Sequence, residues 1–238
     1  MESQEFWFAP VYKNRDPLPK LEVLSFALPS DFQEVFLPSL KDKVIAILLT
    51  HPEVKEEEKS HIEMLEEVAK ETRHLRYFVL DIGTYENLAS DYFKVDEIPK
   101  LAFIKPYAQQ APEIIGLESA AEVIGKIKAL NEEMENKFQA MKGIVFEEIT
   151  KLVNSQKTFA FIKGSPSNPR CKFSRKLLGS WEGLPVMESG LATEDILEKG
   201  VFRSWLPFFT QWPTFPQIFV DGKFVGGVDV VTEMIENE

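Results

Sequence analysis

The two halves of the chain arrange their expected secondary structure in the same order. In each half a strand, a helix, a second strand and a second helix are followed by a pair of strands and a final helix. An Xaa-Pro step opens each pair of strands, Ile98-Pro99 in the first half and Phe215-Pro216 in the second. Helices that alternate with strands are typical of a sheet covered by helices. The order therefore predicts an α/β protein with two copies of one small fold, each a central mixed β-sheet flanked by helices.

In the first half the strongest strand signal is the continuous apolar run at 44–50, typical of a strand covered on both faces. Residues 1–20, rich in aromatic residues, proline and charge, are expected to form an extended arm before a first domain at 21–131. The other elements expected in that domain are helices at 57–72, 85–93 and from 119 towards 130, and strands at 75–82, 101–105 and 113–115.

Residues 132–142 are charged and helix-prone, with no glycine or proline before Gly143. They are interpreted as a helical linker, with one long helix joining the halves as the alternative. In the second domain, at 143–238, Pro207 is expected to end a helix, and Asp221-Gly222 to turn a hairpin. The elements expected there are helices at 145–154, from about 171, at 194–206 and from 229, and strands at 158–163, 185–188, 216–220 and 223–225.

Charge and hydropathy make several classes of partner improbable. The net charge is −11 and the densest charge run, Glu56-Glu57-Glu58, is acidic, so nucleic acid is an unfavourable partner. No apolar run approaches the roughly 20 residues of a membrane helix, and the first residues do not resemble a signal peptide. We therefore expect a cytoplasmic protein without a membrane partner. His51, His61 and His74 stand apart and are interpreted as surface or capping residues, not metal ligands.

Cys171 is the only cysteine in the chain. It cannot form an internal disulfide, so its chemistry would need glutathione, another chain or a metal cluster as the external partner. We expect it at the start of a helix, where the helix dipole and unpaired N–H groups stabilise a thiolate. Lys163, Arg170 and Lys172 add positive charge nearby in sequence, so the thiol pKa should fall below the usual value of about 8.5.

Three further features in the second half suit a peptide ligand. A cis bond before Pro216 would leave the backbone of Phe215 free to pair with an extended peptide. N–H groups at Gly226-Gly227 could hold a carboxylate and Asp229 an ammonium group, and Arg203 is a candidate for a second carboxylate. With Cys171 they describe a groove for a small peptide with two carboxylates, one amine and one thiol. Glutathione is that molecule.

Each of these residues also has a purely structural interpretation. A single cysteine is often an inert core residue, Asp229 would also serve as a helix cap, and Arg203 would also be an ordinary solvated helix residue. We favour the ligand role for Cys171 because Lys163, Phe215 and Asp229 accompany it. The two roles of Asp229 are compatible.

The second half resembles the monothiol glutaredoxins, whose signature is Cys-Gly-Phe-Ser, over residues 145 to 238. The segments that carry the resemblance are FIKGSPSNPRCKFS, WPTFPQIFVDGKF and GGVD. It implies a thioredoxin fold and a catalytic Cys171 that also ligates a [2Fe–2S] cluster bridging a homodimer, with two glutathiones supplying the remaining thiolates. It also implies five further glutathione contacts: Lys163, Arg203, the backbone of Phe215, Val228 and Asp229.

Three positions depart from this family pattern. Lys172 replaces the signature glycine, Pro207 stands where the family has a lysine, and Val228 stands where it commonly has a cysteine. A lysine beside the thiol would either lower its pKa or crowd the face on which a cluster-bridged dimer closes. The departures therefore put cluster assembly in more doubt than glutathione binding.

The first half resembles a thioredoxin domain that has lost its cysteines. The Cys-x-x-Cys window falls on Lys55-Glu56-Glu57-Glu58, and Ile98-Pro99 stands at the position of that fold's cis-proline. Disulfide exchange is therefore excluded in this half. A thioredoxin-like domain before a monothiol glutaredoxin domain resembles the multidomain monothiol glutaredoxins of the PICOT type. The resemblance implies iron–sulfur or iron handling, a cytosolic and nuclear location and BolA-type partners.

Three functions follow as hypotheses. The first is a glutathione-dependent iron–sulfur carrier, and the second is a weak monothiol oxidoreductase acting on glutathione mixed disulfides. The third is a non-catalytic adaptor or assembly subunit that has kept two thioredoxin folds, motivated by the thiol-free first half and the departures at Lys172 and Pro207.

Overall fold

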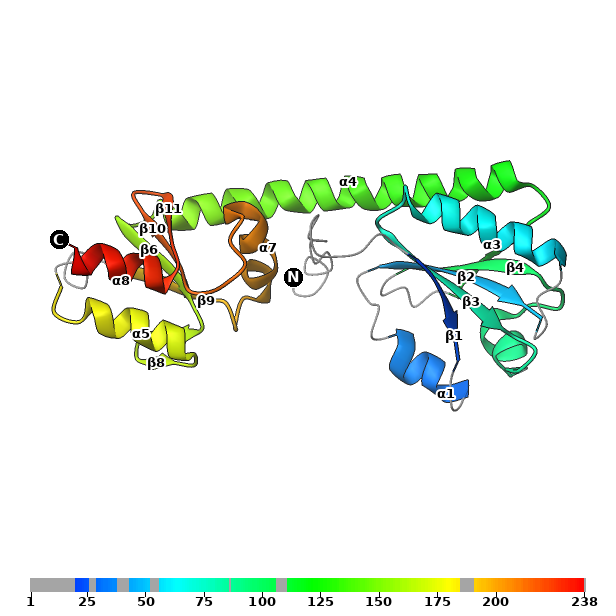
Figure 1. Cartoon of the computed structure of the whole chain (residues 1–238), viewed down its shortest axis with the longest axis horizontal. Coiled ribbons are helices and arrows are strands. Elements are labelled where there is room, and N and C mark those ends of the chain that lie inside the picture. Colours follow the sequence, from blue (N-terminus) through cyan, green and yellow to red (C-terminus); the bar gives the residue numbers. More distant parts are fainter. Residues whose placement is uncertain are drawn as a thin grey trace. The chain divides into compact units, whose positions relative to one another are not determined.

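The computed structural model describes residues 20–25, 29–37, 43–51, 56–85, 87–105, 111–184 and 191–237. The chain divides into two compact units, which meet in sequence between Lys137 and Phe138. Each unit has a mixed β-sheet with helices packed on it, which confirms the predicted fold class (Figure 1). The strand expected at 185–188 and all but the last residue of the expected arm lie outside the described residues.

The sheet of the first unit has the strand order β1-β3-β2-β4-β5. β1 and β2 run parallel to β3, whereas β4 is antiparallel to both β2 and β5. Every residue of the central β2 is buried, as its continuous apolar run predicts. β1 was not predicted, and its two middle residues are exposed. The five strands are β1 (Leu21–Leu24), β2 (Val44–Thr50), β3 (Leu75–Asp81), β4 (Lys100–Ile104) and β5 (Glu113–Ile115).

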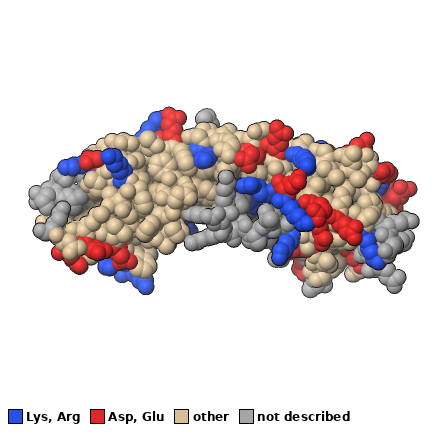
Figure 2. Space-filling model, turned by 45° about the horizontal axis from the view of Figure 1, so that its top comes forward, with Lys and Arg blue, Asp and Glu red and all other residues tan. Residues whose placement is uncertain are grey.

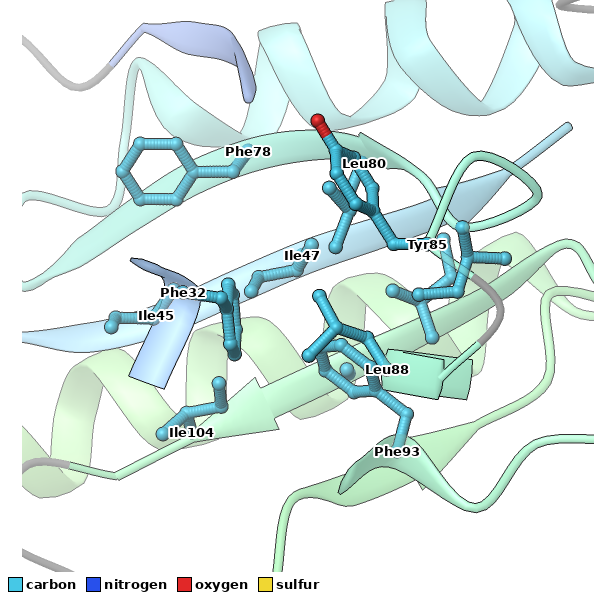
Figure 3. Close-up of a cluster of buried hydrophobic side chains, with 12 residues drawn as sticks. Phe32, Ile45, Ile47, Phe78, Leu80, Tyr85, Leu88, Phe93 and Ile104 are labelled. Carbon is cyan, nitrogen blue, oxygen red and sulfur yellow. The ribbon is translucent and has the colours of Figure 1, made fainter. Parts of the chain in front are cut away.

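Helical segments cover both faces of this sheet. On one face, Phe32, Leu88 and Phe93 pack against Ile45 and Ile47 of β2 (Figure 3). On the other face lie α3 and the beginning of α4 (Figure 1). The helical segments of the unit are α1 (Pro29–Asp31), the π-type turns η1 (Phe32–Phe36) and η2 (Leu88–Phe93), α3 (Glu56–Ala69) and α4 (Ala120–Val153).

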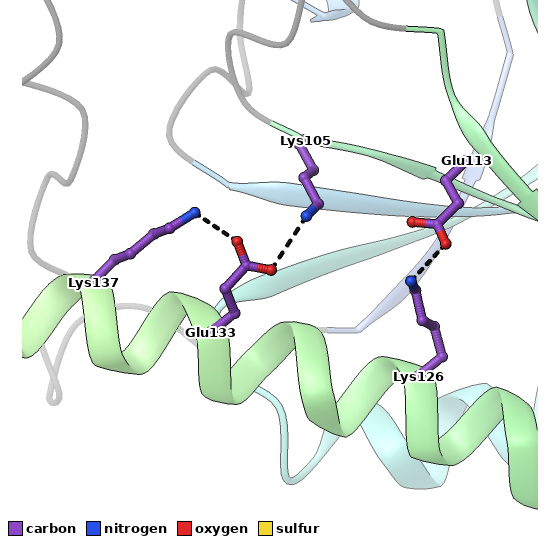
Figure 4. Close-up of polar contacts among 5 residues, drawn as sticks. All are labelled: Lys105, Glu113, Lys126, Glu133 and Lys137. Atoms are coloured by element: carbon purple, nitrogen blue, oxygen red, sulfur yellow. Dashed lines mark hydrogen bonds and ion pairs between the residues drawn. The ribbon is translucent and has the colours of Figure 1, made fainter.

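Ion pairs tie the first part of α4 to the sheet of this unit (Figure 4). Glu133 accepts hydrogen bonds from Lys105 Nζ at 3.2 Å and from Lys137 Nζ at 2.6 Å. Lys126 Nζ lies 2.5 Å from a carboxylate oxygen of Glu113. Since these side chains are partly exposed, each pair contributes at most about 1 kcal/mol. The pairs Lys105–Glu133 and Lys126–Glu113 therefore orient α4 on the sheet more than they add stability.

His74 is buried, so its interpretation as a surface or capping residue was wrong. Its backbone N–H donates to Asn131 Oδ1 at 3.1 Å, and its Nε2 lies 2.6 Å from Glu135 Oε2 on α4. Burial lowers the pKa of the His74 ring and outweighs the opposing effect of Glu135. The loop before β3 therefore packs on α4 through a polar side chain.

α4 is one unbroken helix that includes all of residues 132–142. Of the two sequence-based alternatives for this segment, the structure has the continuous helix, which passes through Gly143 without a break. Acidic and basic side chains lie next to one another on the face shown in Figure 2. Along α4, Glu133 pairs with Lys137 and Glu147 pairs with Lys151. Among the described residues, no helix combines the length and the apolar character needed to cross a membrane.

The sheet of the second unit has the strand order β11-β10-β6-β9, with β9 parallel to β6, and β10 antiparallel to β6 and β11. The end of α4 and α7 bury Ile149, Phe202 and Trp205 on one face. α5 and α8 bury Leu177 and Val231 on the other. The elements are β6 (Thr158–Ile162), β7 (Gly164–Ser165), β8 (Asn168–Pro169), α5 (Lys172–Trp181), β9 (Leu191–Asp195), α7 (Gly200–Thr210), β10 (Gln217–Val220), β11 (Lys223–Gly226) and α8 (Val228–Glu236).

Two sequence predictions in this unit were wrong. The helix expected at 194–206 begins only at Gly200, because Glu194 and Asp195 belong to β9, which pairs with β6, and a turn follows at 196–198. Pro207 does not end that helix but lies inside it, and α7 continues to Thr210. Its ring is buried together with Trp205 and Leu206, so packing against the sheet offsets the missing backbone hydrogen bond.

Candidate functional site

Cys171 is the N-cap residue of α5, as predicted, and its thiol is free and partly exposed. Burial has the largest single effect on the thiol and raises its pKa. The backbone N–H groups of Ser174 and Phe173, the charge of Lys163 and the Ser174 hydroxyl together outweigh burial, so the pKa is lowered from its ordinary value. A thiolate is therefore favoured at this helix start.

Ser174 belongs to the motif around Cys171, but the sequence analysis gave it no role. Its side chain is fully buried, and its hydroxyl oxygen accepts the backbone N–H of Lys163 at 3.1 Å. The carbonyl of Lys163 accepts the N–H of Arg170 at 2.8 Å. The end of β6 is thus held on the start of α5, which brings the Lys163 ammonium within range of the Cys171 sulfur. The sequence signal that could have indicated this contact was a serine three residues after a cysteine expected at a helix start.

The loop between Lys163 and Cys171 forms a small hairpin, with Gly164 opposite Pro169. Gly164 has φ +87°, and a Cβ there would lie 2.4 Å from the carbonyl oxygen of Asn168, so only glycine fits. Asp195, at the end of β9, accepts the N–H groups of Gly164 and Leu197, each at 2.8 Å. One carboxylate oxygen therefore anchors the loop that carries the thiol to the edge of the sheet.

The Phe215–Pro216 bond is cis, as predicted, and so is Ile98–Pro99 in the first unit. The Phe215 ring packs partly buried against the core beneath α7. Outside the strand ladders, no backbone-to-backbone hydrogen bond among the described residues engages Phe215. The side chain of Gln217 accepts from Thr210 at 3.1 Å and donates to the Trp212 carbonyl at 2.8 Å, which fixes the segment before the cis bond.

Asp229 lies in the first turn of α8 with its carboxylate mostly exposed, and it accepts a hydrogen bond from Lys176 Nζ at 2.8 Å. Lys176, on α5, was missed by the sequence analysis because the packing of α5 against α8 is needed to bring the two together. The Val228 side chain is buried in the core, so only its backbone could contact a ligand. The N-cap of α8 is Gly227, which has no side chain to satisfy the helix N–H groups.

Arg203 is exposed on α7, and among the described residues no ion pair or hydrogen bond joins its side chain to Cys171, Lys163 or Asp229. Lys172 lies with its Nζ 4.8 Å from the centroid of the Phe173 ring, which is 41% exposed. Lys163 exerts the largest charge effect on the thiol. The structure thus places one cation at the sulfur and another on a neighbouring aromatic ring.

The first unit contains no cysteine and therefore no thiol. In the expected Cys-x-x-Cys window, Lys55 lies outside the described residues, and Glu58 is buried in the first turn of α3. Among the described residues of the whole chain, no group of three histidine, cysteine, aspartate or glutamate side chains could hold a metal ion.

A free thiol at the N-cap of a helix and a cis-proline directly before a strand, in a mixed sheet with helices on both faces, define a thioredoxin-fold domain of the glutaredoxin class. The Glutaredoxin family model matches residues 159–225. Monothiol glutaredoxin-4 of Schizosaccharomyces pombe is 30% identical over 74% of this chain and 80% of its own length. The chain belongs to the monothiol glutaredoxins.

Two further similarities complete the comparison. Glutaredoxin 3 of Danio rerio is 28% identical over 74% of this chain, which spans only 53% of that protein. The solution structure of the mature form of 1CGrx1 from Trypanosoma brucei is 35% identical to this chain, with a TM-score of 0.34. The match covers 38% of this chain and 62% of the Trypanosoma brucei chain. The matches to the yeast and zebrafish proteins are longer than the second unit alone, so they extend into the thioredoxin-like first unit.

Proposed function

We propose that the second unit binds glutathione beside Cys171, and that the chain acts as a monothiol glutaredoxin in iron–sulfur cluster transfer or iron homeostasis. The observation that carries this proposal is the Cys171 thiol, partly exposed at the start of α5, with a pKa lowered by neighbouring N–H groups and by Lys163. Membership of the monothiol glutaredoxins supports it. An accessible sulfur that ionises more readily than that of a free cysteine suits exchange with a glutathione disulfide and the ligation of a metal.

In this proposal, each charged group of glutathione has an opposite charge on the protein. Lys163 and Arg203 attract its two carboxylates, and Asp229 holds its ammonium group. The backbone of Phe215 pairs with the peptide, and the N–H of Val228 donates to a carboxylate at the start of α8. The exposure of Arg203 and Asp229 leaves both charges accessible.

Calorimetry of the reduced protein with glutathione tests this part of the proposal. We expect saturable binding that weakens several-fold in Lys163→Met, because one carboxylate loses its cation. Lys223→Met is the matched control, since it removes an exposed lysine on β11 away from the thiol. The absence of heat, or equal affinity in both variants, would contradict the proposal.

The second part of the proposal is a [2Fe–2S] cluster shared by two copies of the chain. A cluster held by cysteine takes four thiolates. This chain has one cysteine, so Cys171 from each copy and the thiols of two glutathiones would complete the set. The partly exposed sulfur fits this role. Two departures weigh against the cluster. Lys172, whose Nζ lies over the ring of Phe173, replaces the small residue that follows the cysteine in the family, and the buried ring of Pro207 offers no cation.

Anaerobic reconstitution with iron, sulfide and glutathione tests for the cluster. We expect visible absorption together with a shift from monomer to dimer, and expect both to disappear in Cys171→Ser. Lys172→Gly should increase the yield of dimer if the lysine crowds the dimer face. A colourless monomer from both the wild-type chain and Lys172→Gly would exclude cluster binding by this site.

Weak oxidoreductase activity is the second candidate function, and the lowered pKa of Cys171 favours it. The Cys171 thiolate would attack the glutathione sulfur of a mixed disulfide, forming Cys171–S–S–glutathione and releasing the substrate thiolate. A second glutathione thiolate would then attack that bond, giving glutathione disulfide and regenerating the Cys171 thiolate. An alkylation midpoint near that of free cysteine would argue against this activity.

The adaptor hypothesis, a non-catalytic subunit that has kept two thioredoxin folds, becomes the better one if glutathione does not bind.

The remaining elements of the proposal are a thioredoxin-like domain at 21–131, a helical linker at 132–142 and a glutaredoxin domain at 143–238. We further propose a cytosolic and nuclear location and a BolA-type partner. Co-purification with a BolA-type protein that is lost in Cys171→Ser would support that partner.

A further inference from the structure

Two helices of the second unit contribute opposite charges at the start of α8. Lys176 of α5 donates from Nζ to Asp229 Oδ1 of α8 at 2.8 Å. The two side chains remain 51% and 79% exposed, so both are accessible to a ligand. Leu177, the next residue on α5, is fully buried in the core that also contains Val228 and Val231 of α8. The packing of the two helices therefore sets the position of Lys176 beside Asp229.

The ion pair changes what Asp229 offers to a ligand. An ammonium group that approaches this carboxylate meets a lysine already bound to one of its oxygens, and the two cations repel each other. A ligand without an ammonium group meets no such repulsion and leaves the Lys176–Asp229 ion pair intact. The pair should therefore weaken binding of ligands that carry the amine relative to ligands that lack it.

We propose that Lys176 is a specificity-determining residue, which reduces the site's preference for a free ammonium group by occupying Asp229. The inference rests on the proposed function, since it assumes that Asp229 receives the amine of glutathione. It extends the class of ligands to γ-glutamyl-type thiol peptides whose amine is blocked or missing.

The test compares two ligands that differ only in the amine. Glutathione and glutaryl-cysteinyl-glycine, in which hydrogen replaces the amine, are titrated by calorimetry into the reduced full-length chain and into Lys176→Met. The ratio of their dissociation constants measures the preference for the ammonium group. We expect Lys176→Met to raise this preference about two- to fivefold, the range expected for an exposed ion pair.

Two further variants control the experiment. Arg175→Met removes the neighbouring exposed cation on α5, which does not contact Asp229, and should leave the ratio unchanged. In an Asp229→Asn background, Lys176→Met should no longer change the ratio. A ratio that stays constant or falls in Lys176→Met overturns the inference.

The outcome also separates this inference from the proposed function. If both ligands bind but Lys176→Met leaves the ratio unchanged, only the role of Lys176 is wrong. If neither ligand binds the wild-type chain, the proposed function fails and the inference fails with it. Because Lys176 is half-exposed, Lys176→Met should fold, and an unchanged circular dichroism spectrum would verify this.

Discussion

The hydroxyl of Ser174 connects two parts of the site that are distant in sequence. It accepts the N–H of Lys163 at the end of β6 and also helps to lower the pKa of the Cys171 thiol. Because the side chain is fully buried, solvent cannot replace it in either role. The buried Ser174 hydroxyl therefore has both a structural role and an effect on the thiol.

Ser174→Ala should raise the pKa of Cys171, because the hydroxyl favours the thiolate. The rate of thiol alkylation, measured against pH, should then reach half its maximum at a higher pH than in the wild-type chain. The free energy of unfolding should also fall by about 1–3 kcal/mol, since the buried N–H of Lys163 loses its acceptor. Ser180→Ala, on the same helix, is the control, and an identical alkylation profile in Ser174→Ala would refute the role.

Residue types and spacing indicated some site residues and not others. Cys171, Lys163 and the cis bond before Pro216 follow from local patterns, because a helix start, a strand end and an Xaa-Pro step are visible in sequence. The contact of Lys176 with Asp229 has no such signal, because it depends on how α5 packs on α8. No described polar contact joins Arg203 to the other predicted residues, and the glutathione contacts of all the predicted residues remain predictions.

At the scale of elements, long apolar or strongly periodic segments were predictable. β2, β5 and β6 lie where expected, and α5 starts directly after Cys171 as predicted. β9 was missed, and its last two residues were predicted as the start of a helix, because all its residues are half-buried and show no alternation. Pro207 was read as a helix end because local rules do not include the burial that keeps it inside α7.

The turn from β11 into α8 needs glycine at Gly226, which has φ +150° and would place a Cβ 2.9 Å from Val230. Gly226→Ala should lower the free energy of unfolding by about 1–3 kcal/mol through backbone strain. It should also weaken glutathione binding, because the turn sets the position of Asp229. Denaturant unfolding followed by tryptophan fluorescence, together with calorimetry, would measure both effects.

Gly200→Ala is the matched control for this change. Gly200 opens α7, and a Cβ there would have nothing within 4 Å. The variant should be as stable as the wild-type chain or slightly more stable, since alanine favours a helix. Equal stability of the two variants would show that the turn does not require glycine.

At the scale of the whole molecule, the two units have separate hydrophobic cores, and the described site residues all belong to the second. The division between Lys137 and Phe138 lies inside the helix α4 and within the segment predicted as a linker. The duplicated order of elements indicated two domains. The repeated order of elements does not show where to divide a helix that both units share. The sequence pattern of α4 continues through the boundary between Lys137 and Phe138.

Glutathione should therefore stabilise the second unit and leave the first unchanged. At about 100 times its dissociation constant, a ligand that binds only the folded unit adds about 2.7 kcal/mol. Trp181, Trp205 and Trp212 report on the second unit, and a Trp7→Phe background leaves these as the only tryptophans. Their unfolding should shift to higher denaturant with glutathione, whereas hydrogen exchange in β2 should stay the same. Equal protection of both units would mean that they unfold together.

The strand β1 lies at one edge of the first sheet and pairs with β3 from Leu21↔Tyr77 to Leu24↔Leu80. An uncovered edge strand offers its N–H and C=O groups to strands of other chains, and short edges with charged residues resist such pairing. β1 is four residues long and exposes Glu22. Because β1 covers the edge of β3, it keeps strands of other chains from adding there. A chain that lacks residues up to Leu24 would expose the edge of β3 and should aggregate more readily.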